Sequence, residues 1–86
     1  MSFAAELARR ASDCALLFRL GRDVEAGIAM VELIDAALPL FDSRPADQRQ
    51  RWSLILDQML DCQERQDWLA LADYLDCELV ELLQRA

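Results

Sequence analysis

The chain has 86 residues, 55% of them hydrophobic, and its 16 acidic residues outnumber its basic residues to give a net charge of −7. A chain of this length forms a single domain, residues 1–86, with one small core. The acidic balance argues against nucleic acid and against anionic membrane, because both bind basic surfaces, and it leaves another protein or a second copy of the chain as the expected partner.

Two helices are expected in the first half of the chain. Ser2 is a suitable N-cap and Gly21 is suited to the position after a helix, so the first helix is predicted at residues 2–20. The second helix, predicted at residues 23–39, is apolar around more than half of its circumference, which is typical of a helix contacted on two sides. One apolar face carries Gly27, Met30, Ile34 and Ala37, and another carries Val24, Ile28, Val31 and Leu38.

Gly27 lies in the interior of this second helix, where glycine costs about 1 kcal/mol relative to alanine. A glycine at such a position allows a neighbouring helix to come close. We therefore expect a close packing contact at Gly27, with Leu17 and Phe18 of the first helix opposite.

Two prolines separate the second helix from the third. Pro39 disfavours helical conformation at the residue before it, so it should end or kink the second helix. Pro45 suits the first turn of a third helix, predicted at residues 45–64, and a short link joins that helix to a fourth at residues 67–85. The apolar stripes of the third and fourth helices face each other when the link is counted out. These two helices should therefore be antiparallel neighbours.

Four helices of similar length with short links favour an all-α fold, an up-and-down antiparallel four-helix bundle. The alternative is a pair of stacked helical hairpins, completed by dimerisation, although the chain contains no internal repeat. The apolar fraction of 55% exceeds the roughly 45–50% of ordinary domains. Such a chain either packs very efficiently or keeps apolar surface for a partner.

The sequence contains no constellation of catalytic residues. Histidine is absent, which excludes catalytic triads and histidine-containing metal sites, and there is no glycine-rich phosphate loop. We therefore expect no enzymatic activity, no cofactor and no metal. The densest carboxylate group is interpreted as a solvated acidic face, with a divalent-metal site as the alternative. That alternative site would use Asp57, Asp61, Asp73 and Asp76.

The expected compartment is the cytoplasm. The N-terminal residues contain acids and lack the apolar segment of a secretory signal, and no apolar run is long enough to cross a bilayer. The odd number of cysteines suits a reducing environment, where Cys14, Cys62 and Cys77 would be structural thiols.

The fourth helix carries the surface that is expected to bind a partner. Its apolar residues point in more directions than one neighbouring helix can cover, whereas acidic residues line its other faces. We expect an adaptor or chaperone that covers an amphipathic helix of another protein, or alternatively a structural homodimer. The predicted anchors are Leu75, Leu79, Val80, Leu82 and Leu83, and the residues predicted to set the orientation are Asp73, Asp76 and Glu81.

The stretch DWLALADYLDCELVELL, from Asp67 to Leu83, resembles a segment of small all-helical bacterial proteins, some of which are associated with flagellar systems. The stretch from residue 20 to residue 38 is similar to a glycine-containing segment of the same proteins. The chain differs from their pattern at Cys77, where they have an aromatic residue, and at Glu81, where a proline is common. The resemblance extends to FliT-type chaperones of flagellar and type III export. It implies an all-helical fold, no active site and a client protein as partner.

Overall fold

The computed structural model describes residues 2–85, and every regular element in this range is helical. The all-α fold class predicted from the sequence is thereby confirmed. Three α-helices are followed by a C-terminal arm, in which a π-helical segment joins two short α-helices. The bounds are Phe3–Arg19 for α1, Asp23–Asp42 for α2, Ala46–Glu64 for α3, Trp68–Asp73 for α4, Tyr74–Leu79 for the π-helical segment and Val80–Arg85 for α5.

The helix ends follow local signals in the sequence. The Ser2 hydroxyl accepts a hydrogen bond from the backbone N–H of Ala5 at 3.0 Å and caps α1. The Asp67 carboxylate accepts one from the backbone N–H of Ala70 at 3.2 Å and caps α4. Gly21, just after α1, has a φ of 76°, a left-handed conformation that glycine adopts without a steric penalty. The first link is therefore a tight turn.

Helix α2 does not end at Pro39, the last residue of the predicted range, but continues to Asp42. The additional residues bring Phe41 into the core, where its ring stacks on that of Trp52 with the centroids 4.7 Å apart. Burial and stacking of two large aromatic side chains offset the backbone hydrogen bond that a proline cannot donate.

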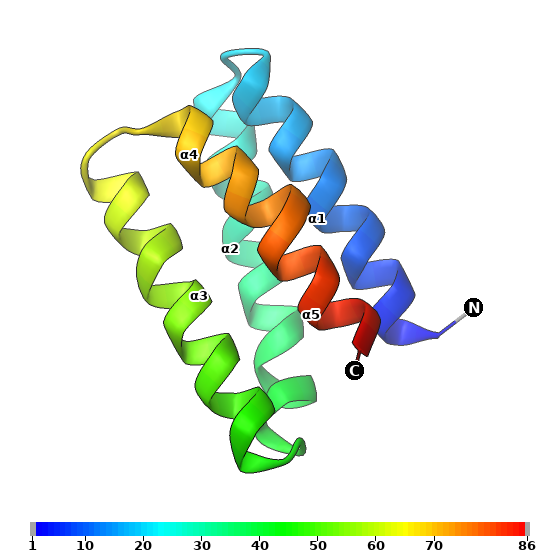
Figure 1. Cartoon of the computed structure of the whole chain (residues 1–86). Helices are drawn as coiled ribbons and strands as arrows, with labels where there is room; N and C mark the ends of the chain where they lie inside the picture. The colour runs from blue at the N-terminus through cyan, green and yellow to red at the C-terminus, as the bar shows by residue number, and fades with distance from the viewer. Residues whose placement is uncertain (1, 86) are drawn as a thin grey trace.

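Helices α1, α2 and α3 and the C-terminal arm run in alternating directions, and the packing between them is uneven (Figure 1). Helix α1 contacts both α2 and the C-terminal arm, while α3 packs mainly on the arm and much less on α2. Helices α2 and α3 meet at the link that joins them and diverge toward their other ends (Figure 1). The bundle is therefore open on its α2–α3 side.

One hydrophobic cluster connects all the helices. Its largest fully buried side chains include Leu7, Met30, Leu33, Phe41, Met59, Leu71, Leu75, Leu79 and Leu83. The accessible surface of 5110 Å² is close to the roughly 5,200 Å² expected for a folded chain of this mass. The chain thus buries an ordinary share of its surface without a partner. None of the helices in the described range combines the length and apolarity needed to span a bilayer.

Candidate functional site

The four leucines predicted to anchor a partner lie in the core of the chain itself. Leu75, Leu79 and Leu83 are 0% exposed and Leu82 is 5% exposed, while Val80 is half-buried against the same cluster. Both α1 and α3 pack on the C-terminal arm. Two neighbouring helices therefore cover the apolar side chains that a single neighbour could not. The prediction of an exposed apolar surface on the fourth helix is therefore wrong for these leucines.

The acidic residues predicted to orient a partner form ion pairs within the chain. Arg19 of α1 reaches Asp73 at 3.0 Å and Asp76 at 2.9 Å, both on the C-terminal arm. Its guanidinium, which donates to the Asp76 carboxylate, lowers the pKa of that carboxyl below its usual value. Glu81 pairs with Arg85, one turn further along, at 2.6 Å. Asp73 and Asp76 therefore connect the arm to α1, whereas the Glu81 pair lies within α5.

The alternative metal site gains no support from the geometry. Among residues 2–85, no three Asp, Glu or Cys side chains are grouped so that they could hold a metal ion. Asp61 instead pairs with Arg65 at 3.0 Å, and Asp73 and Asp76 both bind Arg19.

The three cysteines are free thiols with different surroundings. Cys14 is buried, and its Sγ donates to the backbone carbonyl of Ala26 at 3.3 Å. Burial raises the pKa of the Cys14 thiol to about 11. Cys62 is also buried, which agrees with a structural role for both, whereas Cys77 is exposed.

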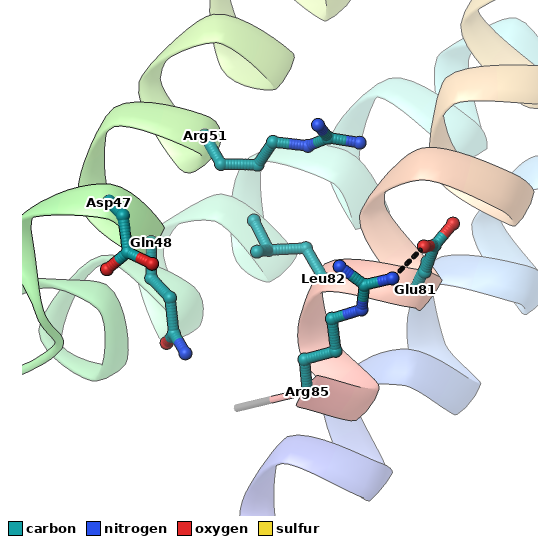
Figure 2. Close-up of a pocket in the computed structure, with 6 residues that line it drawn as sticks. All are labelled: Asp47, Gln48, Arg51, Glu81, Leu82 and Arg85. Atoms are coloured by element: carbon teal, nitrogen blue, oxygen red, sulfur yellow. Dashed lines mark hydrogen bonds and ion pairs between the residues drawn. The ribbon is translucent and has the colours of Figure 1, made fainter.

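A small polar pocket lies between the first turns of α3 and the end of the chain (Figure 2). It is lined by Asp47, Gln48, Arg51, Glu81, Leu82 and Arg85. Arg85 is paired with Glu81 (Figure 2), and Arg51 reaches Glu78 at 3.5 Å. Two arginines balance two carboxylates among the lining residues, so the pocket has no charge that would select an ionic ligand. We assign it no function.

The most extended set of exposed apolar side chains lies on α2. Val24, Ile28 and Val31 are 82%, 58% and 54% exposed, and Leu38 is 39% exposed. Their spacing of four, three and seven residues places them along one face of the helix. We call these four residues the α2 stripe. The other apolar face of α2 is buried in the core and carries Ala26, Met30, Leu33, Ala37 and Phe41.

The α2 stripe borders an open groove between α2 and α3. The groove is lined on the α2 side by Val24, Gly27, Ile28 and Val31, together with acidic residues, and Gln63 contributes from α3. It lies toward the ends of the two helices that diverge in Figure 1. Helix α3 contributes only Gln63 to the lining there, which leaves the apolar side chains of α2 uncovered.

Gly27 faces this groove and is not packed against another helix. Apart from the neighbouring backbone of α2 itself, no heavy atom lies within 4 Å of the position that a Cβ on Gly27 would occupy. The predicted close contact with Leu17 and Phe18 is therefore wrong. The cost of a glycine inside a helix, about 1 kcal/mol, is not offset by any contact within the described chain. Gly27 instead leaves the α2 backbone accessible beside the stripe.

Unpaired carboxylates surround the α2 stripe. Helix α2 has no basic residue, and its acidic residues are Asp23, Glu25, Glu32, Asp35 and Asp42. Only Glu25 forms an ion pair with another described residue, Arg22, at 3.7 Å. On α3, Leu60 is exposed one turn before Gln63 and shares its helix face with Asp57 and Glu64. The groove is thus lined by apolar residues of α2, with the unpaired carboxylates of Asp23 and Glu32 at its edges.

The signal for the stripe was present in the sequence. The periodicity of residues 23–39 predicts this second apolar face, and the expectation of a helix contacted on two sides places it against a neighbouring helix of the same chain.

No protein family, no curated protein sequence and no solved structure matches this chain. The functional conclusion therefore rests on the α2 stripe, the groove beside it and the charges at its edges.

Proposed function

We propose that the protein is a non-enzymatic cytoplasmic adaptor or chaperone that binds another protein through the α2 stripe and the adjoining groove. The observation that carries this proposal is the exposure of the stripe on a helix whose other apolar face already fills the core. Continuous apolar patches on folded domains mark contact sites far more often than isolated exposed residues do. Leu69, exposed singly on another helix, needs no such explanation.

The shape of the stripe favours a helical segment as the bound element. From Val24 to Leu38 it extends about 21 Å, at about 1.5 Å per residue, which is the length of about four helical turns. A regular row of apolar side chains on one helix is suited to the apolar row of another. The resemblance to FliT-type chaperones makes a flagellar or type III export protein the candidate partner. The proposal that the stripe binds a helix holds whichever protein supplies that helix.

The two alternatives raised by the sequence have less support. The structural homodimer was expected to bury the leucines of the fourth helix between two copies, yet those leucines are already buried within one chain. A divalent-metal protein would need a cluster of ligands, and the candidate carboxylates Asp61, Asp73 and Asp76 are paired with arginines.

Site-specific photo-crosslinking tests the proposal. A photoreactive amino acid replaces Ile28 in the stripe or, as a control, Leu54, which is 63% exposed and borders a different pocket with Tyr74 and Glu78. After irradiation of cells that produce the protein, we expect one discrete adduct with another protein from position 28 only. Val31→Arg should remove it. Equal adducts from both positions, or none from position 28, would contradict the proposal, and an adduct of two copies of the chain would support the homodimer.

A further inference from the structure

The charges around the groove indicate what kind of helix fits there. Along α2, Asp23, Glu32 and Asp35 have no ion-pair partner among the described residues, and on α3 the same holds for Asp57 and Glu64. We infer that the partner segment is a basic amphipathic helix of another protein, whose apolar face covers the α2 stripe and whose flanking lysine or arginine residues meet these carboxylates. This inference rests on the proposed function and adds the chemistry of the partner.

The dimensions of the site agree with a single helix. Helices pack with their axes about 8–10 Å apart, and the closest approaches occur where one of them carries a small residue. Gly27 lies between Val24 and Val31 on the side of α2 that faces the groove, with open space above it. A partner side chain can enter at this position, while Val24, Ile28 and Val31 offer apolar contact beside it.

A second copy of the chain is a poor occupant of the same site. In a twofold dimer the same surface meets itself, so α2 would face α2. Neither helix has a basic residue, and the unpaired carboxylates of both copies would be brought together. Like charges across an interface oppose association, and burial of apolar area would have to overcome this repulsion. A basic partner gains from the same charges.

Three synthetic peptides of about 18 residues test the inference, a length that covers the whole stripe. They share one leucine–alanine face and differ only in the flanking residues, which are lysine, glutamine or glutamate. Binding of fluorescent peptides to the full chain is measured by anisotropy at about 50 mM and about 300 mM NaCl. We expect the lysine peptide to bind about tenfold or more tightly than the glutamine peptide, more weakly at the higher salt concentration, and the glutamate peptide to bind least.

Two variants locate the binding. Ile28→Arg should abolish binding of the lysine peptide, whereas Leu54→Arg, an equally exposed apolar position outside the groove, should leave it unchanged. The double variant Glu32→Gln and Asp35→Asn should reduce the preference for the lysine peptide over the glutamine peptide several-fold. The affinity for the glutamine peptide, which comes from apolar contact, should stay the same. Circular dichroism checks that each variant remains helical.

The outcomes separate this inference from the proposed function. Equal affinity for all three peptides, no binding of the lysine peptide, or binding that Ile28→Arg leaves intact would overturn the basic-helix inference. A discrete protein adduct at position 28 would still support a protein-binding role in those cases. Absence of any adduct at position 28 would instead overturn the proposed function.

Discussion

Arg19 and Asp76 are 57 positions apart in the chain and are joined by a hydrogen bond of 2.9 Å between a guanidinium nitrogen and a carboxylate oxygen. Arg19 also reaches Asp73, so one side chain at the end of α1 holds two carboxylates of the C-terminal arm. The pair is partly exposed, and such ion pairs contribute little individually. Their arrangement nevertheless fixes the side of the arm that faces α1.

The Asp76→Asn variant should lower the melting temperature by a few degrees at pH 7, and the difference should disappear in acid. Because Arg19 lowers the pKa of Asp76 below its ordinary value of 3.8, the ionised carboxylate stabilises the folded state. That contribution is complete above the unfolded-state pKa and is lost as the pH falls through the folded-state pKa. Thermal melts between pH 7 and pH 2 test this, with Asp57→Asn as a control without an ion pair. A difference that persists at pH 2 would contradict it.

Replacement of Leu79 by alanine should lower the free energy of unfolding by about 2–5 kcal/mol, because the side chain is 0% exposed and its removal leaves a cavity. Ile28→Ala should change it by less than about 1 kcal/mol, since that side chain is mostly in water. Urea unfolding followed by circular dichroism gives both values. Similar losses for the two variants would mean that Ile28 is packed against the core and would remove the basis for the α2 stripe.

Gly27→Ala should stabilise the chain by about 1 kcal/mol, because alanine is the better helix former and a Cβ at this position meets no atom within 4 Å apart from the neighbouring backbone of α2 itself. For a domain of this size the melting temperature should rise by about 4–8 °C. The same methyl group fills space in the proposed groove, so the lysine peptide should bind more weakly. A loss of stability would show that Gly27 is closely packed after all.

Only Cys77 should react quickly with a thiol reagent at pH 8 in the folded protein. Cys77 is exposed, whereas Cys14 and Cys62 are buried. The pKa of about 11 keeps Cys14 in its protonated, unreactive form at this pH. The reaction is followed with a reagent that releases a coloured thiolate for each cysteine modified. In the control, denaturant is added and all three cysteines react. Rapid modification of Cys14 without denaturant would indicate that α1 and α2 separate readily.

The free chain should sediment as a monomer at neutral pH over a wide range of protein concentration. Contact between two α2 helices would bring unpaired carboxylates together, which opposes association. Analytical ultracentrifugation measures the mass. A dimer that the Ile28→Arg variant dissociates would identify the stripe as a self-association surface instead.

The helices could be predicted because their signals are local. The first and third were expected at residues 2–20 and 45–64, and they are observed at Phe3–Arg19 and Ala46–Glu64. The end of α2 could not be predicted in this way, since its continuation past Pro39 is associated with the stack of Phe41 on Trp52. That stack is a contact between two helices, and the sequence pattern of one helix cannot predict it.

The position of the candidate site could be predicted only in part. Periodicity identified both apolar faces of α2 and the apolar excess of the C-terminal arm. Which of these faces stays uncovered depends on how the helices are arranged: the arm lies against both α1 and α3, whereas α2 has few contacts with α3. The apolar excess was correctly recognised, but the surplus side chains lie on α2, at Val24, Ile28 and Val31.

The stack of Phe41 on Trp52 also gives the proposed groove a direction. It draws α2 and α3 together at one end, while the helices diverge toward Val24 and Gln63 at the other. The two ends of the α2 stripe therefore differ: Val24, Ile28 and Val31 border the open groove, whereas Leu38 lies outside it. Because only one end of the stripe borders the groove, we expect a bound helix to prefer one of the two opposite directions along α2.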